Sequence, residues 1–135
     1  MDASVAVKWL FPEVHADSAK RLLKRDRELI APDLIWAEVT SAVCKRVRRH
    51  EIDAEDAFDM VKDFQRYPIR TFESKNFIDT ALMVAQEADV SVYDGLYLSL
   101  AYSRDCSLVT ADRKLYDKIF KAYPQSEAVW LEDLK

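Results

Sequence analysis

The feature that most constrains the fold is an alternation of short apolar segments with longer segments of helical periodicity. Four short segments are predicted as strands, at Leu29–Ala31, IRTF at 69–72, SLVT at 107–110 and AVWL at 128–131. Helices are predicted at 16–25, 32–50 with Pro32 opening the helix, 53–67, 76–88, 94–104 and 113–123. Strands separated by helices of this length need crossover connections, which favour a mostly parallel sheet covered on both faces. The sequence therefore predicts an α/β fold.

Length and composition bound the organisation of the chain. The 135 residues predict a single domain spanning 1–135, and 50% apolar residues with one glycine predict a well-packed core. No apolar stretch approaches the roughly 18 residues that span a bilayer, and the first residues lack the pattern of a secretory leader. We therefore expect a cytoplasmic protein with no membrane partner.

Cysteine content and charge exclude some classes of protein. Cys44 and Cys106 lack CxxC spacing, so we expect small buried side chains rather than a zinc site or a disulfide. The net charge of −4 argues against a protein that coats nucleic acid non-specifically, because such binding needs a basic surface. It does not exclude a nuclease, because an active site made of carboxylates is itself acidic.

Glu38 lies at an unusual position in its predicted helix. At 100° per residue it falls inside an apolar stripe, whose members are Leu34, Ile35, Val39, Ala42 and Val43. A buried ionised carboxylate costs several kcal/mol, on the order of 3–5 if left unpaired, so Glu38 needs a partner. The partner is either a basic side chain or a bound metal ion; alternatively, Glu38 lies at the edge of the stripe and reaches solvent.

Two aspartates occupy equivalent places farther along the chain. Asp94 follows the β-like segment VSVY and precedes a helix, and Asp112 follows the strand SLVT and precedes another helix. Either could simply cap its helix, a role that contributes roughly 1 kcal/mol. Parallel topology, however, collects such junctions at one edge of a sheet. Asp2, at the head of the chain, is a fourth member if it ends a short first strand.

Four convergent carboxylates need a source of positive charge. Without a matching basic cluster, Asp2, Glu38, Asp94 and Asp112 cannot all stay ionised close together. A divalent cation resolves the repulsion, and ligation by oxygen alone suits Mg²⁺ or Mn²⁺ rather than zinc.

Motifs in four segments carry a resemblance to a known family. They are DAS at 2–4 with the apolar run after it, P-x-L-x-x-x-E at 32–38, SVYDGLYLSLA at 91–101 and LVTAD at 108–112. In this order and spacing the sequence resembles the PIN domain family, and within it the VapC-type toxin ribonucleases of toxin-antitoxin pairs. The resemblance covers almost the whole chain.

The resemblance implies a three-layer α/β/α fold with a central, mostly parallel sheet and a Mg²⁺- or Mn²⁺-dependent endoribonuclease that hydrolyses RNA phosphodiester bonds. The family's metal-binding and catalytic acids correspond to Asp2, Glu38, Asp94 and Asp112, and its hydroxyls near the site to Ser4 and Thr110. Such toxins form homodimers and are inhibited by a cognate VapB-type antitoxin.

Two alternatives stay open beside the toxin. One is a PIN-like nuclease that processes RNA without an antitoxin, and the other is a catalytically silent PIN-like binding module. The start of the chain bears on the second, because in the family several apolar residues form a strand before the first aspartate, whereas here only Met1 precedes Asp2. We expect a truncated first strand, with Asp2 held either by residues upstream or by a neighbouring element.

Overall fold

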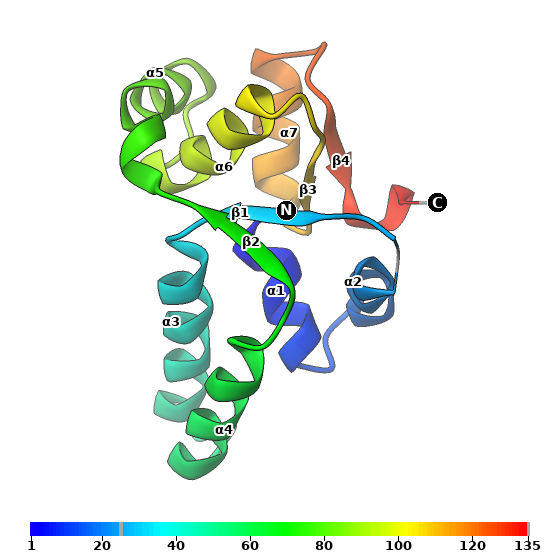
Figure 1. The fold of residues 1–135 in the computed structure, drawn as a ribbon, viewed down its shortest axis with the longest axis vertical. Helices are drawn as coiled ribbons and strands as arrows, with labels where there is room; N and C mark the ends of the chain where they lie inside the picture. The colour runs from blue at the N-terminus through cyan, green and yellow to red at the C-terminus, as the bar shows by residue number, and fades with distance from the viewer. Residues whose placement is uncertain (25, 135) are drawn as a thin grey trace.

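The computed structural model describes residues 1–24 and 26–134 and contains the predicted alternation of helices and strands (Figure 1). In chain order the elements are α1 (Ala3–Leu10), α2 (Ala16–Leu23), β1 (Leu29–Pro32), α3 (Ile35–Arg48), α4 (Ala54–Phe64), β2 (Ile69–Phe72), the 3-10 helix η1 (Ser74–Phe77), α5 (Ile78–Ala88), α6 (Val92–Ser103), β3 (Leu108–Thr110), α7 (Arg113–Ala122), β4 (Ala128–Trp130) and the 3-10 helix η2 (Leu131–Asp133). The α/β class is confirmed.

The parallel strands are divided into two ladders. β1 pairs with β2 in parallel, Leu29 opposite Ile69, and β3 pairs with β4 in parallel, Leu108 opposite Ala128. In Figure 1, β1 and β2 cross the middle of the molecule, with α1 to α4 on one side and α5 to α7 on the other. Parallel pairing is thus as predicted, but the strands do not form one continuous sheet.

The first two residues lie between the ladders. The Met1 amino nitrogen donates to the Ile30 carbonyl of β1 at 3.4 Å, and the Asp2 amide donates to the Val109 carbonyl of β3 at 3.1 Å. Both side chains are buried. Within this structure Asp2 is therefore held by the neighbouring strand β3, and Met1 by β1.

A helix that the sequence analysis did not predict begins directly after Asp2. Helix α1 runs from Ala3 to Leu10 and buries Val5 and Trp9, which are four residues apart and so share one face. The Asp2 side chain caps it by accepting a hydrogen bond from the Val5 amide at 3.3 Å. A capping aspartate before an apolar pair at this spacing was the signal for the helix.

Predicted boundaries differ from the structure next to two site residues, Glu38 and Asp94, and another predicted boundary lies outside the described residues. Pro32 ends β1 and the following helix begins at Ile35. The segment VSVY is not β-like, because Val92 already opens α6 and Ser91 is its N-cap. The end of the first predicted helix falls on Arg25, outside the described residues; α2 is assigned up to Leu23.

The cysteines also differ from expectation, since Cys44 is exposed and Cys106 is half-buried. Among the described residues no helix has both the length and the apolar character needed to cross a membrane.

One close contact fixes α6 against α5. Gly95 is the chain's one glycine, and a Cβ built there would lie 2.5 Å from the Ala81 carbonyl oxygen. A side chain of any size would push the two helices apart, so glycine is needed for the approach of the backbones. Because Asp94 precedes Gly95, this contact also sets the position of a predicted site residue.

Candidate active site

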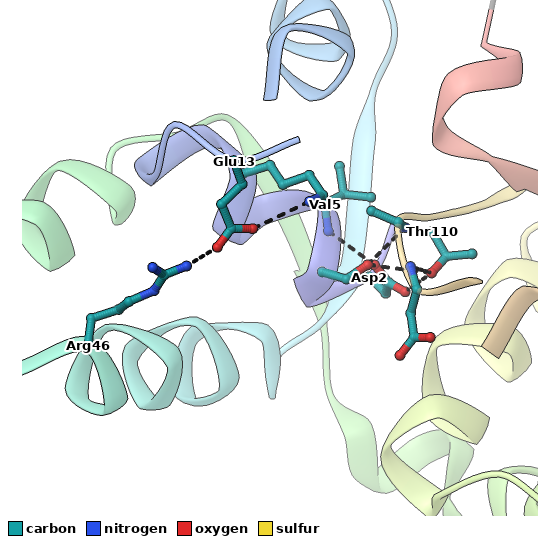
Figure 2. Close-up of polar contacts among 9 residues, drawn as sticks. Asp2, Val5, Glu13, Arg46 and Thr110 are labelled. Carbon is teal, nitrogen blue, oxygen red and sulfur yellow. Dashed lines mark hydrogen bonds and ion pairs between the residues drawn. The ribbon is translucent and has the colours of Figure 1, made fainter. Parts of the chain in front are cut away.

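Asp2 is buried and hydrogen-bonded on both carboxylate oxygens. It is 4% exposed; Oδ1 accepts from the Ser4 hydroxyl at 2.5 Å and from the Val5 amide, and Oδ2 accepts from the Thr110 hydroxyl (Figure 2). Burial raises the pKa of the Asp2 carboxyl, although the bonds from Ser4 and Thr110 act in the opposite direction. This carboxylate is firmly fixed by the protein itself.

Ser4 and Thr110 connect Asp2 to the start of α7. The Ser4 hydroxyl accepts from the Ala111 amide at 2.9 Å, and the Thr110 hydroxyl accepts from the Asp112 amide at 3.0 Å. Each hydroxyl therefore donates to Asp2 and accepts from the backbone just after β3. These bonds tie the N-terminus to the β3–α7 junction.

Glu38 is half-buried in the first turn of α3 and has a neutral partner. Its Oε2 accepts from the Tyr97 hydroxyl at 2.6 Å, and in the part of the chain that the structure describes no lysine or arginine pairs with it. Burial raises the pKa of Glu38, and repulsion from Asp94 and Asp2 raises it further. The salt-bridge alternative for Glu38 is thus wrong within the described residues.

Asp94 lies in the first turn of α6 and is half-buried. It is not the N-cap: Ser91 holds that position, accepting from the Asp94 amide at 3.0 Å and donating to Asp94 Oδ2 at 2.7 Å. This reciprocal pair resembles a capping box and fixes the carboxylate without a charged partner.

Asp112 does cap a helix. Its Oδ1 accepts from the Leu115 amide at 3.1 Å at the start of α7, and its side chain is exposed. It approaches the other acids through Thr110, which binds both its amide and Asp2. The capping alternative is therefore correct for Asp112, whereas the cap that Asp2 provides for α1 was not predicted.

All four acids lie at helix N-termini, of α1, α3, α6 and α7 respectively. The positive end of a helix dipole favours an anion by about 0.3–1 kcal/mol. The charges of Asp2 and Asp94 raise the pKa of Glu38, and the charges of all three acids raise the pKa of Tyr97. These three carboxylates therefore lie near one another. The helix ends thus supply part of the positive field that basic side chains do not.

The carboxylates of the site can hold a hard divalent cation only if water or substrate phosphate supplies the other ligands. Across residues 1–24 and 26–134, no three acidic, histidine or cysteine side chains are grouped closely enough to hold a metal ion. Mg²⁺ commonly binds through one or two carboxylates, with water and substrate phosphates completing its shell. Glu38 and Asp94 fit that mode, because among the described residues each carboxylate accepts one side-chain hydrogen bond, whereas both Asp2 oxygens are already bonded.

Tyr97 is a residue beside the site that the sequence analysis did not single out. Its side chain is 3% exposed, and burial together with the adjacent Glu38 strongly raises the pKa of the phenol, which keeps its proton. The available signal was its spacing, since a residue three positions after Asp94 shares a helix face with it.

The fold and these residues define an α/β domain with a carboxylate site at the N-termini of its helices. Residues 1–121 match the PIN domain family, and the chain belongs to that family.

Named relatives and a solved structure agree with this assignment. The chain is 28% identical over 120 residues to Ribonuclease VapC3 of Pyrobaculum aerophilum, covering 87% of this chain and 92% of that protein. It is 27% identical over 117 residues to Ribonuclease VapC9 of Mycobacterium tuberculosis, covering 87% of each. The crystal structure of PAE2754 from P. aerophilum superposes with a TM-score of 0.71 at 26% identity, covering 98% of this chain and 90% of that one.

Proposed function

We propose that the protein is an endoribonuclease of the VapC type, the toxin of a toxin-antitoxin pair, which hydrolyses RNA phosphodiester bonds. The observation that carries this proposal is the pair Glu38 and Asp94, two half-buried carboxylates from different helices, each held by a hydroxyl and neither neutralised by a cation among the described residues. Membership of the PIN family and the names of the VapC relatives support the same interpretation.

Each predicted residue then has a distinct part in the proposed site. Glu38 and Asp94 would hold Mg²⁺ or Mn²⁺. When bound, the cation would neutralise phosphate charge and lower the pKa of the attacking water. Asp2 would add negative charge to the site from its buried position, and its bonds to Ser4 and Thr110 keep its oxygens oriented. Asp112, which caps α7, is the most exposed of the four and would orient water or a weaker second ion.

The partners follow from the same proposal. An RNA substrate and a VapB-type antitoxin are the expected macromolecules, and the protein would work as a homodimer in the cytoplasm. Exposed apolar side chains on α5, among them Ile78 at 47% and Leu82 at 52%, support a protein-binding surface because they share one helix face.

Cleavage of a panel of structured RNAs tests the enzyme. The parent protein with Mg²⁺ or Mn²⁺ should cut at least one RNA, whereas Asp94→Asn should lose roughly 100-fold or more of the rate, because a neutral amide holds a hard divalent cation less well than a carboxylate does. The amide introduced by this change can still bond Ser91, so the fold should persist. Equal cleavage by both proteins would remove Asp94 from the mechanism.

The silent binding module is the second candidate, and one observation favours it. Both Asp2 oxygens are engaged by the protein, which leaves fewer free ligands than four acids suggest. An inert parent protein on every RNA, with either metal, would support this module. Processing without an antitoxin differs in that no short DNA-binding protein would co-purify from native cells.

A further inference from the structure

Tyr97 joins α3 and α6, the two helices that carry Glu38 and Asp94. It lies on α6, three residues after Asp94, and its hydroxyl donates to Glu38 Oε2 on α3 at 2.6 Å. Tyr97 is 3% exposed and Glu38 is half-buried, so the bond is shielded from solvent on the tyrosine side. One face of α6 therefore presents a carboxylate and also holds the carboxylate of α3.

We propose that Tyr97 is a positioning residue, which fixes the Glu38 carboxylate through Oε2 and leaves Oε1 as the oxygen that would be available to a divalent cation. The proposal rests on the proposed function, because it assigns Glu38 as a ligand. A hydrogen bond to one oxygen restricts rotation of the carboxylate and leaves the other oxygen for the metal. Groups that orient ligands in this way typically change metal affinity 10- to 100-fold when they are removed.

Helix α6, which carries Tyr97, is packed closely against α5. Gly95, two residues earlier, lets the α6 backbone approach α5 until a Cβ there would lie 2.5 Å from the Ala81 carbonyl oxygen. This close contact limits sliding of α6 along α5. It therefore helps to keep the Tyr97 backbone, and with it the phenol, in place beside Glu38.

A purely structural role would give a different response. Tyr97→Phe keeps the buried ring and removes only the hydroxyl, so loss of packing is small. Tyr102→Phe is the matched control, because Tyr102 lies on the same helix but is 86% exposed. The measurement is Mn²⁺ binding to the full chain by calorimetry at fixed pH, which needs no RNA.

We expect Tyr97→Phe to weaken Mn²⁺ binding roughly 10-fold or more, with Tyr102→Phe unchanged. A double-mutant cycle then shows whether the effect passes through Glu38. In a Glu38→Ala background, Tyr97→Phe should weaken binding no further, because the carboxylate that it positions is gone. The Mn²⁺ concentration for half-maximal RNA cleavage should rise by the same factor, while the rate at saturating Mn²⁺ recovers.

The outcomes separate the two proposals. If the parent protein binds no Mn²⁺ and cuts no RNA, the proposed function fails and takes this inference with it. If the parent binds Mn²⁺ and Tyr97→Phe binds it equally well, only the positioning role is overturned. The same holds if the losses of Mn²⁺ affinity caused by Tyr97→Phe and Glu38→Ala are additive in the double mutant. Should Tyr97→Phe fail to fold, Glu38→Asp replaces it, since it draws the carboxylate away from an intact Tyr97; unchanged Mn²⁺ affinity there would overturn the role.

Discussion

Asp2 and Asp94 are the same residue type at the same kind of place, a helix N-terminus, yet the protein holds them by different means. Asp2 is buried and held by its own side-chain bonds to Ser4, Val5 and Thr110. Asp94 has one hydroxyl partner, and its position depends on the backbone contact beside it at Gly95. One carboxylate is fixed through its oxygens, and the other is placed by its helix with its oxygens left largely free.

The largest effect should come from Gly95→Ala. The new Cβ would meet the Ala81 carbonyl oxygen at 2.5 Å, so α6 must shift or the backbone must distort. We expect the free energy of unfolding to fall by about 3 kcal/mol, as for overpacking of a core, with loss of RNA cleavage because Asp94 moves with the helix. Urea unfolding measures the change in the free energy of unfolding, and Gln86→Ala on the exposed face of α5 is the control. A stabilised variant would contradict the role of this contact.

Asp2→Ala should have the next largest effect, lowering the free energy of unfolding by about 2 kcal/mol. The change removes the cap of α1 and leaves the Thr110 hydroxyl, which is fully buried, without its acceptor. Asp94→Ala removes one partly exposed bond to Ser91 and should cost under about 1 kcal/mol. Equal costs for the two changes, measured by urea unfolding in EDTA, would erase the distinction between these carboxylates.

Thr110→Val should lower the free energy of unfolding by about 1.5 kcal/mol. Valine keeps the shape of the side chain but leaves both the Asp2 carboxylate and the Asp112 amide without the hydroxyl. Thr110→Ser keeps the hydroxyl and should recover most of that loss. If serine is as destabilising as valine in thermal unfolding, the methyl group rather than the hydroxyl matters at this position.

The smallest effect is a pH dependence of the metal-free protein. Burial raises the pKa of both Asp2 and Glu38, so the folded protein takes up their protons at a higher pH than the unfolded chain does. Stability from these groups should therefore rise as pH falls from neutral toward about 4.5, near their ordinary values. The lowered pKa of Asp33, due mainly to its bond from Ser74, acts only below the ordinary value of 3.8.

Urea unfolding in EDTA at several pH values measures this dependence, and Glu38→Gln should flatten it. A protein that loses stability steadily from neutral pH downward would show that other groups dominate.

The class of fold and the family were predictable from the sequence, because both rest on patterns that local chemistry imposes. Alternating periodicity predicts βαβ units, and the structure and the family match confirm the α/β class and the PIN resemblance. Asp112 at the end of β3 was placed by the same logic, since a strand ends where a capping residue begins a helix. The metal-binding roles of the four acids stay predictions.

What failed depends on contacts that no local pattern reveals. The VSVY segment looked β-like because valine and tyrosine favour strands, but Ser91 caps α6, in which Val92 is half-buried and Tyr93 is exposed. The partner of Glu38 is a tyrosine 59 positions away, which sequence spacing cannot distinguish from an ordinary core residue. The division of the strands into two ladders likewise depends on what lies between them.

That division has a consequence for how the molecule opens. Met1 and Asp2 lie between the ladders and bond to one strand of each, and Asp2 also belongs to the acidic site. Fluctuations that separate the ladders must break bonds around Asp2 before the rest of either ladder unfolds. Amide hydrogen exchange at Asp2, Ala111 and Asp112 should therefore report on the integrity of the site as one cooperative unit, and slow together when the site is occupied.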